Sequence, residues 1–301
     1  MASRWWIYQR ERFPVLAHGP LIAAFSFSAV SVSALLRGRM ELPEARSLLV
    51  AGVSTFVFFL ELRVADEFKD SGEDALYRPY RPVPRGLVTL KELGMVGAAG
   101  MLIQLGLALW LDPTLVLLLV PTWLYLGLMS KEFFAPEWLR TRPITYLWTH
   151  MLIMPLIVLY ATACEWLVAG VAPPASLPWF LAVGFFNGIV IEVGRKIRGP
   201  EDEEPGVTTY TTLWGPGKAV LALLGAMLLA AAAAVPAARR IGVAEPAAGL
   251  MAVLFGTASL LGWRFLRLPG THRAKMVEVM SGVWTLLLYL CLGAVPWLAR
   301  G

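Results

Sequence analysis

The sequence predicts an all-α integral membrane protein, and three observations support this fold class. Hydrophobic residues make up 57% of the 301 residues and charged residues only 16%, whereas a soluble domain carries roughly a quarter charged residues. Nine apolar stretches are long enough to cross a hydrocarbon core, which takes about 20 helical residues. Lysine and arginine gather in alternate loops. We therefore expect one transmembrane domain over residues 1–301 with nine helices.

The nine predicted spans follow one another through short loops. They cover about residues 14–36, 47–65, 93–111, 113–130, 143–169, 176–193, 217–237, 246–266 and 276–298. Only the stretch LDP at 111–113 separates the third span from the fourth, and because proline starts a helix well but rarely continues one, we expect a tight helical hairpin there. The first residues, MASRWWIYQRERFPVL, lack the pattern of a cleaved secretory signal, so we expect them to stay on the mature protein.

The loops predict the orientation of the chain. Of the 26 lysines and arginines, twenty fall on one side of the predicted spans and six on the other. The six are Arg37, Arg39, Arg46, Arg239, Arg240 and Arg300. Because cytoplasmic loops are enriched in these residues, the N-terminus is predicted inside and the C-terminus outside a bacterial inner membrane or a plasma membrane. No basic block is long enough to suggest a nucleic-acid partner.

A strongly polar segment, DEFKDSGEDALYRPYRPVPRG at 66–86, follows the second span. Asp66, Asp70 and Asp74 are spaced i, i+4 and i+8, and Glu67 lies three residues before Asp70, so on a helix the four carboxylates would point to nearly one face. Carboxylates so close repel one another unless a cation lies among them. Oxygen ligands with room for water suit Mg²⁺ bridged to a phosphorylated substrate. The four acids are therefore predicted as catalytic metal ligands.

The second half of this segment carries arginines separated by prolines. Arg78, Arg81 and Arg85 alternate with Pro79, Pro82 and Pro84, and guanidinium groups match the geometry of phosphate oxygens. Together with Mg²⁺, the arginines are predicted to hold a diphosphate while the bilayer accommodates a lipid tail. The plainer alternative is a solvated charged loop.

The pattern DExxDxxxDxxxxPxRPxPxG resembles the first aspartate-rich motif of the UbiA superfamily of intramembrane prenyltransferases, NDxxDxxxD followed by PxRPxxxG. Asp66 takes the place of the motif asparagine and Glu67 that of its first aspartate, so both depart from the usual pair. Asp70 and Asp74 match the remaining aspartates, and Arg81 matches the motif arginine. The resemblance implies nine helices around a lipid-open central cavity, cytoplasmic active-site loops at about 66–92 and 192–216, and an isoprenoid diphosphate held by Mg²⁺.

The segment NGIVIEVGRKIRG at 187–199 stands where the family has a second acidic motif. Glu192 takes the place of the leading aspartate, whereas Arg195 stands where the next aspartate would be. In one interpretation, Glu192 and Asn187 orient a Mg²⁺ ion while Arg195 and Lys196 contact the diphosphate. In the other, the later acids at 201–203 fold back as metal ligands. We favour the first, because spacings of three and four place Glu192, Arg195 and Lys196 on one helical face.

These residues lead to one preferred function and two alternatives. Lys131, in YLGLMSKEFF, resembles the family's loop lysine and is predicted to contact the diphosphate. The preferred function is a Mg²⁺-dependent prenyltransferase whose acceptor, an aromatic or lipid molecule, is not identified. The first alternative is an intramembrane terpene cyclase that acts on a single isoprenoid diphosphate. The second is a transporter of metal ions or small solutes, although transporters usually place their binding groups near the membrane midplane.

Overall fold

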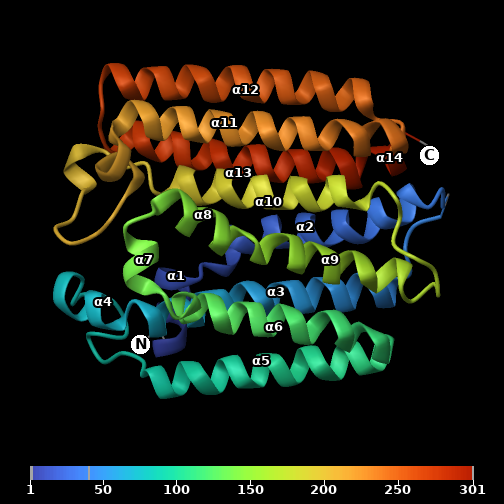
Figure 1. Cartoon of the computed structure of the whole chain (residues 1–301), viewed down its shortest axis with the longest axis horizontal. Helices are drawn as coiled ribbons and strands as arrows, with labels where there is room; N and C mark the ends of the chain where they lie inside the picture. Colours follow the sequence, from blue (N-terminus) through green and yellow to red (C-terminus); the bar gives the residue numbers. More distant parts are fainter. Residues whose placement is uncertain (1–2, 40, 300–301) are drawn as a thin grey trace. The chain divides into compact units, whose positions relative to one another are not determined.

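The computed structural model describes residues 3–39 and 41–299, and in this part of the chain every regular element is a helix (Figure 1). The elements are α1 (Arg4–Arg12), α2 (Val15–Leu36), α3 (Ala45–Lys69), α4 (Ser71–Tyr77), α5 (Leu90–Leu111), η1 (Pro113–Leu115), α6 (Val116–Ser130), η2 (Glu132–Phe134), α7 (Pro136–Arg140), α8 (Pro143–Met151), α9 (Ile153–Trp166), α10 (Leu177–Arg195), η3 (Pro200–Asp202), α11 (Tyr210–Ile241), α12 (Ala244–Arg267), α13 (Thr271–Gly293) and α14 (Val295–Leu298).

The predicted membrane spans are confirmed in number. Among the described residues, nine helical segments are long and apolar enough to cross a bilayer, and their bounds lie within a few residues of most of the predicted ones. The helix of the seventh span begins earlier than predicted, at Tyr210, because α11 includes a short turn before a kink at Gly215. Arg300, counted among the outer cations, lies outside the described residues. The orientation of the chain and its kind of membrane stay predictions.

Two spans are interrupted by proline. The fifth span consists of α8 and α9, which part after Met151. Pro155 has no N–H to donate to the Met151 carbonyl four residues earlier, and its ring would clash with that carbonyl. In α11, Gly215 has φ 78° and ψ 158°, directly before Pro216. Glycine tolerates this positive φ, so α11 consists of a short first turn and a long membrane-spanning part.

The helices group into two compact units. The first unit contains the residues up to Val30 and Pro43–Ala172; in it α3 packs against α5 and α9, and α6 packs against α9. The second contains Ser31–Leu42 and the residues from Pro173 on; in it α10 packs against α11 and α13, and α12 packs against α11 and α13. This grouping does not test the prediction of one domain over residues 1–301, which stays a prediction.

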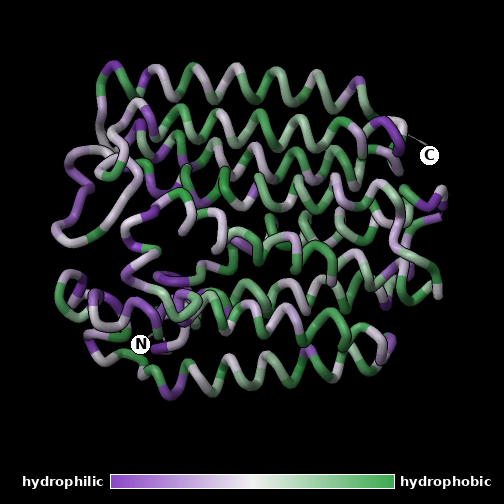
Figure 2. Tube along the Cα trace, in the orientation of Figure 1, coloured by the Kyte–Doolittle hydropathy of each residue, from purple (hydrophilic) through white to green (hydrophobic). Residues whose placement is uncertain are grey.

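Each unit concentrates its polar residues at a helix end. In the first unit, hydrophilic residues gather around α1, α4 and α7, at the end where α3 stops and α5 starts (Figure 2). Thr89 and Glu92 form a capping box at that start, which satisfies backbone N–H groups that helices otherwise leave open. In the second unit, hydrophilic residues gather where α10 ends and α11 begins (Figure 2).

The C-terminal end of α10 approaches α13 closely at Gly194. A Cβ atom added there would lie 2.0 Å from Oγ and 2.6 Å from Cβ of Ser281. We expect Gly194→Ala to lower the free energy of unfolding by about 1 to 3 kcal/mol through overpacking, seen as a lower midpoint of thermal unfolding in detergent. Adding Ser281→Gly should restore the midpoint. Gly225→Ala is the matched control, because a Cβ there meets no atom within 4 Å; a Gly225→Ala loss as large as that of Gly194→Ala would contradict the argument.

Candidate functional site

The acidic segment of the first unit is not one continuous helix, which corrects the arrangement that its spacing suggests. Helix α3 ends at Lys69, Asp70 forms the junction, and the separate helix α4 carries Asp74. Ser71 and Gly72 follow the junction and are weak helix formers. Helical hydrogen bonds nevertheless continue across it, since the Asp70 N–H donates to the Asp66 carbonyl and the Asp74 N–H to the Asp70 carbonyl, both at 2.8 Å.

Asp74 is held by the arginines that follow it. Its side chain is buried, and Arg81 Nη1 donates to both carboxylate oxygens, at 2.8 and 3.1 Å. Arg78 Nη2 lies 2.8 Å from Asp74 Oδ1. The arginine and proline segment is thus folded back onto the acidic segment. This contact places two of the three predicted diphosphate-binding arginines beside a predicted metal ligand. The third, Arg85, pairs with Glu11 at 3.0 Å.

Glu67 is held by Arg12, a residue that the sequence interpretation missed. Glu67 is 2% exposed, and Arg12 Nε lies 2.5 Å from its Oε1. Arg12 Nη2 also lies 4.0 Å from Asp74 Oδ2. Arg12 therefore connects the two buried acids of the motif although it precedes Glu67 by 55 positions.

A signal for Arg12 exists in the N-terminal residues. Trp5, Tyr8 and Arg12 are spaced i, i+3 and i+7, which puts them on one face of a helix. In the structure these residues form part of α1, Tyr8 is buried and Trp5 packs with it against Val88 and Leu93. An arginine that continues a buried aromatic face needs an acidic partner. The spacing thus indicates a buried ion pair but not its partner.

Asp66 and Asp70 differ in their electrostatic surroundings. Asp66 Oδ2 lies 2.6 Å from Arg63 Nη2. In the described part of the chain, the Asp70 side chain takes part in no hydrogen bond or ion pair. Burial raises the pKa of Asp70; Lys69 opposes this, and the charges of Asp66 and Asp74 add to it. Asp70 therefore has no direct ion-pair partner among the described residues, and the positive charges of Lys69 and Arg78 only partly offset the effect of its burial.

Lys69 joins this end of α3 to two other elements. Its ammonium donates to the Tyr146 hydroxyl of α8 and lies 4.0 Å from Glu132 Oε1. Residues 132–134 have φ values of 48°, 53° and 58°, a left-handed turn that costs roughly 1 to 2 kcal/mol per residue for side chains with a Cβ. Lys131 directly precedes this turn and is exposed, and its side chain forms no ion pair with any described residue. Its contact with a diphosphate stays a prediction.

Glu192 in the second unit forms the cluster that its spacing predicts. Arg195 donates to Glu192 Oε2 from Nη2 at 2.5 Å and from Nε at 2.7 Å. Lys196 Nζ lies 2.9 Å from Glu192 Oε1. The prediction that the three side chains share a face at the end of α10 is confirmed. Their roles toward a metal ion or a diphosphate stay predictions.

Asn187 lies elsewhere on α10. It is 1% exposed, and its Oδ1 accepts a hydrogen bond from Trp284 Nε1 of α13 at 3.2 Å. Five positions separate it from Glu192, so the two side chains leave the helix in different directions. The structure therefore places Asn187 in the packing between α10 and α13 and does not bring it to the Glu192 cluster.

The acids at 201–203 hold the loop after α10. Glu203 accepts hydrogen bonds from Thr209 at 2.8 Å and from Thr211 at 2.5 Å. Glu201 and Asp202 accept from the Thr271 hydroxyl at 3.1 and 3.0 Å. Because these carboxylates bind neutral hydroxyl groups at the start of α11 and of α13, they hold the shape of the loop. Their binding of a metal ion stays a prediction.

The chemistry of the first-unit acids fits Mg²⁺, although they are not arranged as a finished metal centre. Among the described residues, no group of three or more His, Cys, Asp and Glu side chains is placed to hold a metal ion. The four acids nevertheless offer the carboxylate oxygens that Mg²⁺ prefers. Mg²⁺ usually keeps several water ligands and needs only one or two carboxylates from the protein. A metal ion could bind Asp70 without displacing an arginine, because the Asp70 carboxylate forms no ion pair with any described residue.

Comparison with known proteins identifies the family. The model of the UbiA prenyltransferase family matches residues 26–282. The chain belongs to this family. The match contains both polar clusters, from Asp66 to Arg81 and from Glu192 to Lys196. Membership in the UbiA family supports an intramembrane prenyltransferase as the general class of activity. No curated protein matches this sequence.

Solved UbiA structures share the fold. A digeranylgeranylglyceryl phosphate synthase superposes with a TM-score of 0.61 at 16% identity, covering 98% of this chain and 99% of that one. A UbiA homologue from Aeropyrum pernix gives 0.66 at 16% identity, with coverages of 91% and 95%. A UbiA homologue from Archaeoglobus fulgidus bound to DMAPP and Mg²⁺ gives 0.53 at 12% identity, with coverages of 93% and 99%.

Proposed function

We propose that this chain is a Mg²⁺-dependent prenyltransferase that transfers a prenyl group from an isoprenoid diphosphate to an aromatic or lipid acceptor. The observation that carries the proposal is the folded segment of Asp66, Glu67, Asp70 and Asp74 with Arg78 and Arg81, in a chain of the UbiA family. The similar structure from Archaeoglobus fulgidus, bound to DMAPP and Mg²⁺, supports the substrate class.

In the proposed reaction, the allylic C–O bond of the donor breaks and its electron pair stays on the diphosphate. The prenyl cation then forms a bond to a nucleophilic atom of the acceptor, and that atom loses its proton to the diphosphate or to water. The products are the prenylated acceptor, diphosphate and one proton. Bound Mg²⁺ would supply positive charge to the leaving diphosphate, with the four acids as its ligands. The apolar helices keep water away from the cation.

The arginines have a further role in this proposal. Arg78 and Arg81 are paired with Asp74, and a diphosphate offers their guanidinium groups more negative charge than one carboxylate does. When the substrate binds, Arg78 and Arg81 would exchange the Asp74 carboxylate for the diphosphate and so hold it. Lys131 in the first unit, and Arg195 and Lys196 in the second, stay predicted diphosphate contacts, and Glu192 stays a predicted metal ligand. Asn187, which was also a candidate for the substrate site, lies in the packing between α10 and α13.

The test is turnover by the purified chain in nanodiscs. Dimethylallyl, geranyl, farnesyl and geranylgeranyl diphosphates are supplied in turn with Mg²⁺, with and without a membrane lipid extract, and diphosphate release and lipid products are measured. We expect release that requires both the extract and Mg²⁺, with removal of Mg²⁺ by EDTA lowering it by at least about 100-fold. Re-addition of Mg²⁺ should restore it.

The same experiment separates the alternatives. Release without extract, accompanied by a cyclic hydrocarbon, would show a terpene cyclase in place of a transferase. No release from any donor, with and without extract, would contradict both enzymes and leave the transporter. Diphosphate release that persists in EDTA would contradict the proposed role of the four acids as Mg²⁺ ligands, but it would remain consistent with prenyl transfer.

A further inference from the structure

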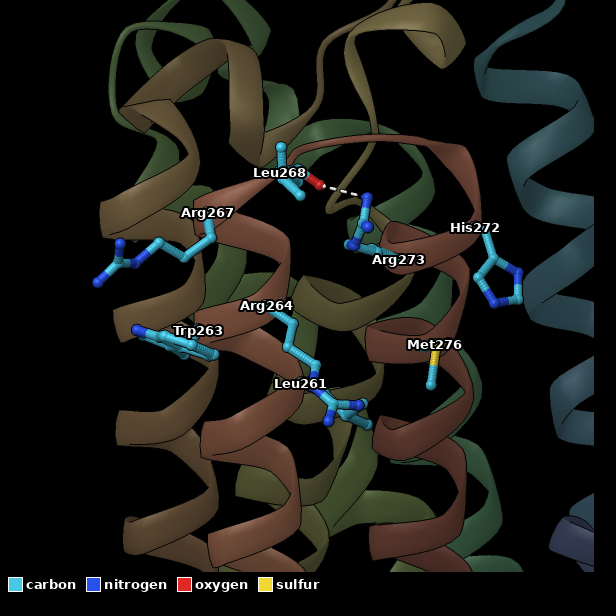
Figure 3. Close-up of a pocket in the computed structure, with 8 residues that line it drawn as sticks. All are labelled: Leu261, Trp263, Arg264, Arg267, Leu268, His272, Arg273 and Met276. Atoms are coloured by element: carbon cyan, nitrogen blue, oxygen red, sulfur yellow. Dashed lines mark hydrogen bonds between the residues drawn. The ribbon is translucent and has the colours of Figure 1, made fainter.

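A basic pocket lies at the hairpin between α12 and α13, on a part of the second unit that the proposed reaction does not use (Figure 3). Its volume is about 560 Å³, and its eight lining residues include three arginines and a histidine but no acid. Ligand pockets measure roughly 300 to 1,000 Å³. The pocket is thus large enough for a small anionic group and is lined with cations.

The three guanidinium groups have no acidic partner among the described residues. Arg273 Nη1 donates to the Leu268 carbonyl at 2.9 Å. This hydrogen bond satisfies a carbonyl group at the end of α12, so the partner of Arg273 is a backbone carbonyl and not a carboxylate. Arg267 lies over the ring of Trp263, with its Cζ 5.2 Å from the ring centroid. Arg264 forms neither contact. The pocket therefore carries excess positive charge.

The direction of Arg264 indicates an anion beside it. Figure 3 shows its side chain extending along the hairpin toward Leu261, away from the loop. Leu261 lies one turn nearer the middle of α12, about 4.5 Å along the axis. An arginine near a span end normally extends toward water, and a guanidinium that turns toward apolar side chains is costly without an anionic partner.

The depth of the pocket points to a lipid. Trp263 is 52% exposed and lies one turn before the end of α12, and tryptophans at span ends sit at the headgroup level of a bilayer. Leu260 and Leu266, on the same stretch of α12, are also exposed. A lipid could place its phosphate beside the arginines and its acyl chain along these apolar residues, and so match both the charged and the apolar part of this surface.

We propose that the pocket binds the headgroup of an anionic glycerophospholipid. The phosphate accepts hydrogen bonds from Arg264, whose planar guanidinium group matches its oxygens. Arg267 extends to the other side, over Trp263 (Figure 3), and attracts the headgroup by its charge. The acyl chains lie against the exposed leucines of α12. Basic pockets between membrane helices are a known setting for such headgroups, and charge complementarity makes a zwitterionic lipid the weaker ligand.

Native mass spectrometry of the detergent-purified chain tests this proposal with phosphatidylglycerol and phosphatidylcholine of equal chain length. We expect the wild type to retain phosphatidylglycerol in preference. Arg264→Gln/Arg267→Gln should weaken its binding by about thirtyfold, since each arginine near an anionic headgroup contributes about fivefold. Binding of phosphatidylcholine should stay unchanged.

The matched control is Arg140→Gln/Arg142→Gln in the first unit. It removes the same charge, and Arg142 likewise lies over a tryptophan, with its Cζ 4.6 Å from the ring centroid of Trp138. We expect this control to keep the preference for phosphatidylglycerol. Thermal unfolding supplies a second readout that does not depend on transfer to the gas phase: phosphatidylglycerol should raise the midpoint of the wild type and the control but not that of Arg264→Gln/Arg267→Gln.

Four outcomes would overturn the proposal. They are equal retention of the two lipids by the wild type, an unchanged preference in Arg264→Gln/Arg267→Gln, an equal loss in the control, and displacement of phosphatidylglycerol by millimolar inorganic phosphate. The third would indicate a general effect of surface charge, and the fourth a site for free phosphate. Prenyl transfer is not needed for any readout, so the proposed function is tested separately.

Discussion

Asp70→Asn is expected to lower prenyl transfer by about 100-fold or more while leaving the protein folded, because a ligand of the ion that stabilises the leaving diphosphate is lost. The measurement is diphosphate release with the donor that the wild type prefers, at saturating Mg²⁺. Asp70 is the clearest position for this test, since in the described part of the chain no arginine pairs with its carboxylate. Its replacement therefore breaks no ion pair.

The stability of Asp70→Asn distinguishes a functional acid from a structural one. Because burial raises the pKa of Asp70 in the folded chain, the ionised form destabilises the fold at pH values above that raised pKa, and the cost disappears as the pH falls below the pKa of the unfolded chain. Asparagine removes the charge at every pH. We therefore expect an equal or higher unfolding midpoint at neutral pH, together with lost turnover.

Glu73→Gln is the control for Asp70→Asn. Glu73 lies in the same segment and is exposed, and its replacement by glutamine removes the same charge as Asp70→Asn. The turnover of Glu73→Gln should stay within about twofold of the wild type, because exposed charges interact weakly. Asp74→Asn should lose both turnover and stability, since it leaves Arg78 and Arg81 without their acid. Normal turnover in Asp70→Asn would contradict the proposed metal site.

Arg12→Gln is expected to have the largest effect on stability. The ion pair with Glu67 is buried on both sides, with 9% and 1% of the side chains exposed, and removal of one partner leaves an uncompensated charge that costs about 3 to 5 kcal/mol. The measurement is thermal unfolding in detergent. Activity should fall as well, because Arg12 also lies 4.0 Å from Asp74.

A double-mutant cycle tests that this effect comes from the ion pair. Glu67→Gln added to Arg12→Gln should recover most of the lost stability, because neither charge is then buried alone. Arg10→Gln on the same helix is the control, since Arg10 is exposed, and its midpoint should stay close to that of the wild type. Additive losses in the double variant would show that Arg12 and Glu67 do not stabilise each other.

The sequence predicted most of the secondary structure because membrane spans depend on local composition. Apolar length alone indicates where the chain crosses the bilayer, and nine spans are found among the described residues. Where the structure differs, the cause is again local: Pro155 divides the fifth span, and Ser71 and Gly72 follow the end of α3. The periodicity of the acids predicted one helical face but not the break at Asp70.

The candidate site was predicted in part. Glu192, Arg195 and Lys196 meet as their spacing indicates, because i, i+3 and i+4 neighbours on one helix contact each other in any tertiary context. Asn187 was grouped with them by proximity in sequence, yet it faces Trp284 of α13. Side chains five positions apart on a helix point to different faces, so Asn187 and Glu192 diverge. Only the packing of α10 against α13 shows that the face of Asn187 meets Trp284.

The sequence by itself thus determined the membrane class, the helices and the identity of the acidic and basic segment, since each follows from composition or from spacing within one element. Tertiary structure decided which polar groups pair. Arg12 reaches Glu67 across 55 positions, Lys69 reaches Tyr146 across 77, and Thr271 reaches Glu201 across 70. Partners so distant depend on how the helices pack. For the buried pair of Arg12 and Glu67, packing brings both charges into one low-dielectric region, where they must compensate one another.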